Sequence, residues 1–173
     1  MRAQQRWRAA IECYDRALKV PGIDDRKVKD GLEAGKQLAE GERDRLLAQA
    51  GEHLNEGRSA EKQSAWMEAV RHYTGGLELR FEDKDLREEL KDAQVKATQK
   101  LDDARAEARR LLDAGDSETL QQHWTAAIEC YDSGLAVAGV DDPELTAELD
   151  AAKQLAEQQR DVAKAQQLSC ERK

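Results

Sequence analysis

The chain has 173 residues, a formal net charge of −8 and no block of lysine and arginine. It therefore lacks the concentrated basic surface that binding to phosphate backbones or to anionic lipid surfaces requires. We therefore expect no nucleic-acid partner, and no apolar run is long enough to predict insertion into a membrane. Charged residues make up 37% of the chain and aromatic residues only 4%, a composition that favours helices over sheets.

The same segment occurs three times along the chain. Residues 5–15 return as residues 122–132 with few changes, and a more divergent copy occupies residues 65–73. Trp7, Trp66 and Trp124 mark a period of about 58 to 59 residues. A period of this length is typical of an array of supersecondary units.

Each copy contains a short segment in which apolar or small residues recur at helical spacing. Counted from the tryptophan, they fall at i, i+3, i+4, i+7, i+10 and i+11, which predicts one continuous apolar face on an α-helix. We interpret the tryptophans as part of this packed face rather than as a platform for stacking bases or sugars. The positions are Trp7, Ala10, Ile11, Tyr14, Ala17 and Leu18; Trp66, Ala69, Val70, Tyr73, Gly76 and Leu77; and Trp124, Ala127, Ile128, Tyr131, Gly134 and Leu135.

A longer helix is predicted after each short one. Apolar or small residues step by three or four through residues 28–57 and 86–115, and again through residues 145–156. We expect Gly57 and Gly115 to end the first two long helices, because glycine is favoured just past a helix C-terminus.

The next short helices would then begin soon after these glycines, with Ser59 and Ser117 as capping residues. The third long helix is predicted to begin near Pro143 with Asp141 or Asp142 as its cap.

These elements predict an all-α fold, an elongated array of antiparallel helical hairpins. The three repeats are assigned to residues 1–57, 58–115 and 116–173, each with a short and a long helix. The chain opens on a short helix with no long helix before it, and the first copy is as apolar as the third. Because array ends normally carry polar caps, we interpret the chain as a fragment of a longer array.

No catalytic, cofactor-binding or metal-ligating residue is nominated from the sequence. Catalysis needs a nucleophile, a tuned acid or base and an anion-stabilising group together, and no motif of that kind occurs. The aspartate pairs 24–25 and 141–142 lack the alternating oxygen ligands of a calcium loop, and helix capping explains them more simply. We therefore expect no enzyme, no cofactor and no metal.

The histidines and cysteines are interpreted as structural or surface residues. His53, His72 and His123 occupy different positions in the repeat, which indicates no shared ligand geometry. Cys13 and Cys130 occupy the position that His72 fills in the middle copy, and we expect small half-buried fillers there. A third cysteine, near the C-terminus, is expected to be exposed: Cys170.

The short-helix pattern resembles the second helix of a tetratricopeptide repeat, in which an aromatic residue, an Ala-Ile pair, a second aromatic residue and an Ala-Leu pair recur at this spacing. The chain also looks like the MIT domain, a three-helix bundle, with residues 104–115, 124–135 and 145–156 as its helices. In that reading each long helix is the third helix of one unit and the first helix of the next. Either resemblance implies a scaffold that binds helices or extended peptides in grooves between its own helices.

The leading expectation is therefore a non-catalytic scaffold for protein–protein interaction. Its partners would be other proteins, through helical or extended peptides, or further copies of its own repeat. The alternative is a structural spacer in a large repetitive cytoskeletal, flagellar or surface-associated protein, in which such a repeat could be antigenic. The first seven residues lack the apolar core of a signal peptide, so we expect an intracellular protein, cytoplasmic or associated with the cytoskeleton.

Overall fold

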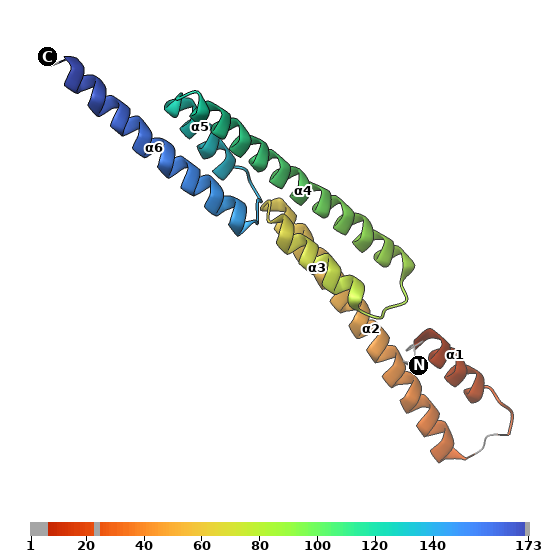
Figure 1. Cartoon of the computed structure of the whole chain (residues 1–173). Helices are drawn as coiled ribbons and strands as arrows, with labels where there is room; N and C mark the ends of the chain where they lie inside the picture. Colours follow the sequence, from red (N-terminus) through yellow and green to blue (C-terminus); the bar gives the residue numbers. More distant parts are fainter. Residues whose placement is uncertain (1–6, 23–24, 172–173) are drawn as a thin grey trace. The chain divides into compact units, whose positions relative to one another are not determined.

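The structure, a computed structural model, describes residues 7–22 and 25–171, with the side chains of the last helix described through residue 168. Six helices and no strands occur among these residues, so the predicted all-α class is confirmed. Figure 1 shows short and long helices alternating along the chain. The helices are α1 (Trp7–Leu18), α2 (Arg26–Lys62), α3 (Trp66–Glu78), α4 (Lys84–Leu120), α5 (Trp124–Leu135) and α6 (Pro143–Glu171).

At least half of the positions of the predicted apolar face are buried in each of α3 and α5, whereas in α1 only Ile11 is buried and the other positions are half-buried. Ile11 is buried in α1, Tyr73 and its neighbours on the same face in α3, and Tyr131 with Ile128 in α5. The tryptophans are only half-buried, because each lies in the first turn of its helix, at the edge of the packed face.

The predicted ends of the first two long helices are wrong. Gly57 and Gly115 lie inside α2 and α4, and both helices continue for several more residues. The chain instead turns at Ser64 and Gln122, which have left-handed φ values of 57° and 63°. Equivalent backbone hydrogen bonds close both turns, including Ala65 N–H to Ala60 O and His123 N–H to Glu118 O, a Schellman arrangement without glycine.

The short helices consequently begin later than expected, at the tryptophans rather than soon after Ser59 and Ser117. In α5 the residue before the first turn is His123, and its side chain makes no capping hydrogen bond.

The long helices begin at aspartate caps, as predicted for the third copy. Pro143 is the first residue of α6, and the Asp142 carboxylate accepts a hydrogen bond from the Leu145 N–H at 3.1 Å. Asp83 makes the same contact at the start of α4, with the Leu86 N–H at 2.8 Å. These side chains satisfy N–H groups that a helix start leaves without partners.

Contacts divide the chain into two compact units. Unit 1 comprises Met1–Ser59 and Glu68–Val95, and unit 2 comprises Ala60–Met67 and Lys96–Lys173. The boundaries fall inside α2, α3 and α4.

In unit 1, α3 packs against both α2 and α4. A Cβ added at Gly57 of α2 would overlap the ring of Tyr73, and one added at Gly76 of α3 would lie 3.0 Å from a methyl group of Leu90 in α4. Tyr73 and Leu90 are fully buried there.

In unit 2, α5 packs in the same way against α4 and α6. The ring of Tyr131 lies against Gly115 of α4, and Leu149 of α6 lies against Gly134. A hydrophobic cluster in this unit is formed by Ala108, Ala127, Ile128, Tyr131, Leu145, Leu149 and Ala156. In the part of the chain that the structure describes, no helix has the length and apolarity needed to cross a membrane.

Candidate functional site

The loop between α3 and α4 is held by one arginine. Arg87, near the start of α4, donates hydrogen bonds to the carbonyl oxygens of Leu77, Leu79 and Phe81 at 3.3, 3.1 and 3.0 Å. Its guanidinium carbon lies 4.6 Å from the centroid of the Phe81 ring, which is buried. Arg87 therefore satisfies the free carbonyls at the end of α3 and fixes the position of the charged residues that follow Phe81.

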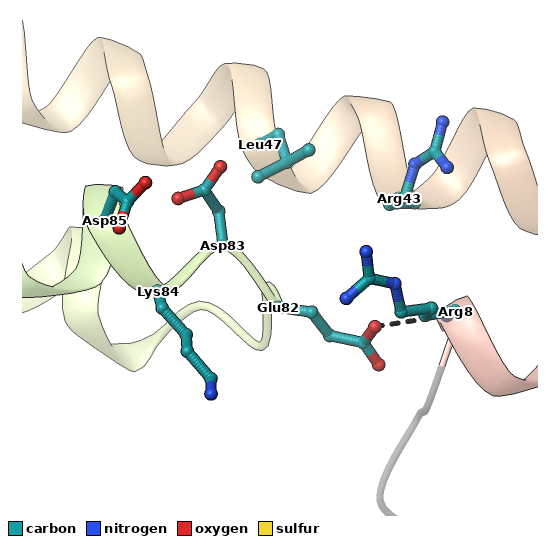
Figure 2. Close-up of a pocket in the computed structure, with 7 residues that line it drawn as sticks. All are labelled: Arg8, Arg43, Leu47, Glu82, Asp83, Lys84 and Asp85. Atoms are coloured by element: carbon teal, nitrogen blue, oxygen red, sulfur yellow. Dashed lines mark hydrogen bonds between the residues drawn. The ribbon is translucent and has the colours of Figure 1, made fainter.

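These charged residues line a pocket in unit 1. Figure 2 shows that it lies where the start of α1, the middle of α2 and the α3–α4 loop come together. Its volume is about 550 Å³, within the range of ligand-binding clefts. The lining residues are Arg8, Arg43, Leu47, Glu82, Asp83, Lys84 and Asp85.

The pocket carries charges of both signs and a single apolar side chain, that of Leu47. Three of its groups already have partners. Glu82 Oε2 accepts the Arg8 backbone N–H at 3.2 Å, and Asp83 caps α4. Arg43 Nε donates a hydrogen bond to Asp44 Oδ1 at 2.8 Å. The remaining lining side chains that carry a charge are exposed or half-buried. Such a lining suits a polar segment of a polypeptide with its own mixed charges better than a small apolar molecule.

In unit 2, the position equivalent to this pocket is occupied by an arginine side chain. One repeat further on, the position of Leu47 is taken by Arg105, which donates a hydrogen bond to the Asp141 carbonyl oxygen at 3.0 Å. The Arg105 Nε also lies 3.9 Å from a carboxylate oxygen of Asp142. An arginine therefore contacts the turn before α6 directly, whereas the corresponding loop in unit 1 faces a leucine.

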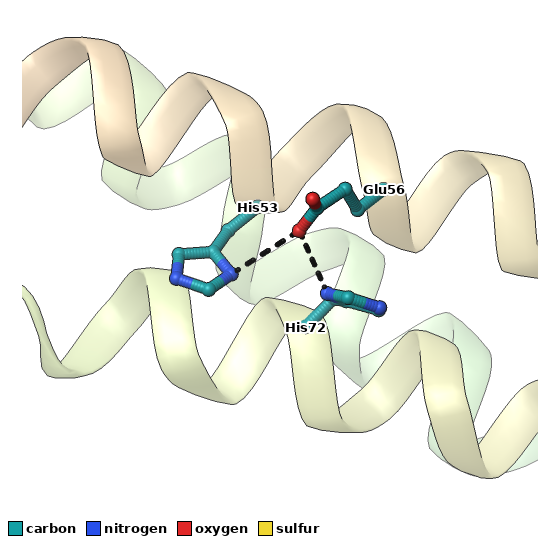
Figure 3. A group of neighbouring side chains, drawn as sticks. All are labelled: His53, Glu56 and His72. Carbon is teal, nitrogen blue, oxygen red and sulfur yellow. Dashed lines mark ion pairs between the residues drawn. The ribbon is translucent and has the colours of Figure 1, made fainter.

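A second group of ionisable side chains lies between α2 and α3 of unit 1. Figure 3 shows His53 and Glu56 on α2 and His72 on α3, with the Glu56 carboxylate between the two imidazole rings. Glu56 Oε2 lies 3.0 Å from His72 Nδ1 and 3.7 Å from His53 Nδ1. The three ligand atoms all lie within 4.8 Å of one another, and the ring centroids of the histidines are 6.1 Å apart.

The third histidine and the cysteines are placed separately. His123 is largely exposed and pairs with Glu118 at 2.9 Å in unit 2. Cys130 is half-buried as expected, but Cys13 is exposed, because it lies on the solvent side of α1 where Arg16 contacts its sulfur at 3.3 Å. The side chain of Cys170 and the residue Asp24 lie outside the described residues.

The His53–Glu56–His72 cluster was missed in the sequence because its members come from two helices and share no repeat position. Two signals point to it once the helices are paired. His53 and Glu56 are three residues apart and therefore share a helix face. Gly57, next to Glu56, receives the ring of Tyr73, which places the neighbouring His72 beside Glu56.

Comparisons with protein-family models, with curated proteins and with solved structures each found no match to this chain. The resemblance to tetratricopeptide repeats and MIT domains therefore rests on the residues of the repeat alone.

Proposed function

We propose that this chain is a non-catalytic helical-repeat scaffold that binds other proteins through the mixed-charge pocket of unit 1. The observation that carries the proposal is the pocket itself. It is open, of binding-site size, and bordered by a loop that Arg87 and Phe81 hold in place. A preorganised loop lowers the entropy cost of binding.

Support for a repeat scaffold comes from a junction that is built once in each unit. In unit 1 the start of α1 contacts the loop after α3, through Arg8 and Glu82. In unit 2 the start of α3 contacts the turn after α5, where a side chain at Gly139 would overlap Trp66 and the Ser64 carbonyl oxygen. The start of each of these short helices thus meets the loop that follows the next short helix, which is a contact that stacks one repeat on another.

We further propose that the array is tetratricopeptide-like or MIT-like. Each of the short helices α3 and α5 packs against a long helix on both sides. This is the arrangement expected if successive MIT-like units share their long helices. The partner is then a helix or extended peptide with charges of both signs. The free thiols of Cys13 and Cys130 fit the reducing interior of a cell, where we place the protein.

The alternative function is a structural spacer, and one observation favours it. The outer copies repeat even a surface ion pair between the short helix and the following long helix: Lys36 to Asp15 at 2.7 Å and Lys153 to Asp132 at 2.6 Å. The hydrogen bond to Lys36 lowers the pKa of Asp15, and the one to Asp132 raises the pKa of Lys153. A chain selected for uniform units would retain such pairs without any ligand.

Capture from a lysate of cells that express the chain distinguishes the two functions. The immobilised full chain is compared with a pocket variant, Arg43→Ala with Asp85→Asn, which leaves the Asp83 cap intact. The matched control removes one positive and one negative charge from exposed positions in unit 2, Arg109→Ala with Glu148→Gln. Circular dichroism confirms that all three are equally helical.

The scaffold proposal expects the wild type and the control to retain the same protein and the pocket variant to retain much less of it. Retention of nothing, or only of proteins that carry this repeat, would support the spacer. Equal retention by all three chains would move the binding surface away from the pocket.

A further inference from the structure

The cluster of His53, Glu56 and His72 has the donor set of a transition-metal site. Two imidazoles and one carboxylate are the protein ligands of many zinc centres, in which a water molecule takes the fourth position. Glu56 is more than half exposed, so that water can reach this position from solvent.

The two distances from the Glu56 carboxylate fit a tetrahedral zinc ion. Zinc–ligand distances of about 2.0–2.2 Å place the ligand atoms about 3.3–3.5 Å apart in tetrahedral geometry. The distances from the Glu56 oxygen, 3.0 and 3.7 Å, lie on either side of that value. All three ligand atoms lie within 4.8 Å of one another, and Glu56, the most exposed of the three side chains, has room to adjust toward a shared ion.

His53 is oriented as a ligand rather than as a hydrogen-bonding residue. Its Nδ1 atom is buried and has no hydrogen-bond partner among the described residues, although the carboxylate of Glu56 lies 3.7 Å away. The Cε1 edge of the imidazole lies against α3, where a Cβ at Gly75 would be 3.2 Å from His53 Cε1. The absence of a side chain at Gly75 therefore leaves room for the ring, and the packing fixes the direction in which Nδ1 points.

His72 has a carboxylate near each of its two ring nitrogens. Its Nδ1 faces Glu56, and its Nε2 lies 3.8 Å from a carboxylate oxygen of Glu68, one turn earlier in α3. A carboxylate that accepts a hydrogen bond from the second ring nitrogen orients a ligating imidazole and raises its basicity, and Glu68 is placed to do so if this distance shortens.

The other repeats lack this donor set. One repeat further on, the positions of His53, Glu56 and His72 are taken by leucine, alanine and cysteine, so unit 2 provides an internal comparison without the site. These residues are Leu111, Ala114 and Cys130.

From this geometry we propose that His53, Glu56 and His72 bind one zinc ion, with water as the remaining ligand, and that the ion fastens α2 to α3 in unit 1. The ion joins two helices of one hairpin. Because it binds the folded chain and not the unfolded chain, it stabilises the fold.

The test is a zinc titration of the full chain after treatment with a chelator. Serine replaces all three cysteines in every protein, so that thiolates do not compete for the ion. Calorimetry is expected to give one zinc ion per chain, and zinc is expected to raise the melting temperature. His72→Gln and Glu56→Gln are each expected to weaken zinc binding by about 100-fold or more. Loss of an outer partner alone weakens metal binding about 10- to 100-fold in other proteins, and loss of a ligand costs more.

The matched control is His123→Gln, which removes a histidine that also pairs with a glutamate, in unit 2. It is expected to bind zinc as the parent does. Circular dichroism without metal shows whether each variant is folded, and the visible absorption of bound Co²⁺ reports tetrahedral coordination as a second readout. No binding to the folded parent at millimolar zinc would overturn the proposal, and so would equal binding by the parent and both ligand variants.

Discussion

At the scale of single residues, a close tyrosine–glycine contact packs a short helix onto a long helix in each unit. Tyr131 is 1% exposed, and the edge of its ring lies where a Cβ on Gly115 would be; Tyr73 and Gly57 repeat this contact in unit 1. Glycine inside a helix costs up to about 1 kcal/mol relative to alanine. Here that cost is offset by burial of a complete aromatic ring against the helix backbone.

We therefore predict opposite effects of the same substitution at two glycines. Gly115→Ala is expected to lower the free energy of unfolding by about 1–3 kcal/mol, because the added methyl group overpacks against a buried ring. Gly41→Ala is expected to raise it by up to about 1 kcal/mol, since Gly41 is exposed in α2 and nothing lies within 4 Å of the added atom. Urea unfolding measures both; a Gly115→Ala protein as stable as the wild type would contradict the close contact.

At the scale of helices, periodicity predicted the buried faces well because helix packing selects residues at a fixed spacing. Ala50 and Leu54 of α2 and Leu145 and Leu149 of α6 all lie on the predicted stripes and are buried. The C-terminal ends of α2 and α4 were not predictable in this way.

Glycine is both a common helix terminator and the residue that permits close contact with a ring. The pattern alone did not distinguish these roles at Gly57 and Gly115. The actual turns use Ser64 and Gln122, whose residue types carry no strong preference for left-handed backbone.

Tyr131 also joins the end of α4 to α5 by hydrogen bonds. Its hydroxyl donates to Asp116 Oδ1 at 2.8 Å and lies 3.0 Å from Thr119 Oγ1. Burial raises the pKa of Tyr131, and the Asp116 carboxylate acts in the same direction, whereas the hydrogen bond with Thr119 lowers it. The neutral phenol is thus favoured in the folded chain.

This shift predicts a loss of stability in alkali. The unfolded tyrosine releases its proton from about pH 10, before the folded one does, so the free energy of unfolding falls as the pH rises above that value. Tyr131→Phe is expected to cost about 1 kcal/mol at neutral pH and to show a shallower fall above pH 10. The raised pKa values of Lys36 and Lys153 also lower the free energy of unfolding in alkali. They do so equally in the wild type and in Tyr131→Phe, so the difference between the two proteins reports Tyr131. Denaturant unfolding at several pH values tests this, and parallel pH profiles would contradict it.

At the scale of the whole chain, the repeat specifies the same junction twice, and divergence at single positions gives each junction its own chemistry. Leu47 in place of an arginine leaves the α3–α4 loop bordering an open pocket in unit 1, whereas Arg105 binds the corresponding turn in unit 2. Neither the pocket nor the His53–Glu56–His72 cluster could be predicted from the sequence. Both depend on which helix faces meet, and the period of a repeat does not state that.

The most direct test of the account is amide hydrogen exchange of the chain with and without the protein that it captures. We predict slower exchange in peptides that cover residues 40–48 and 79–88, which border the pocket, and no change in residues 137–146, the matching turn of the third copy. Protection confined to other residues, with exchange around the pocket unchanged, would contradict binding at this site.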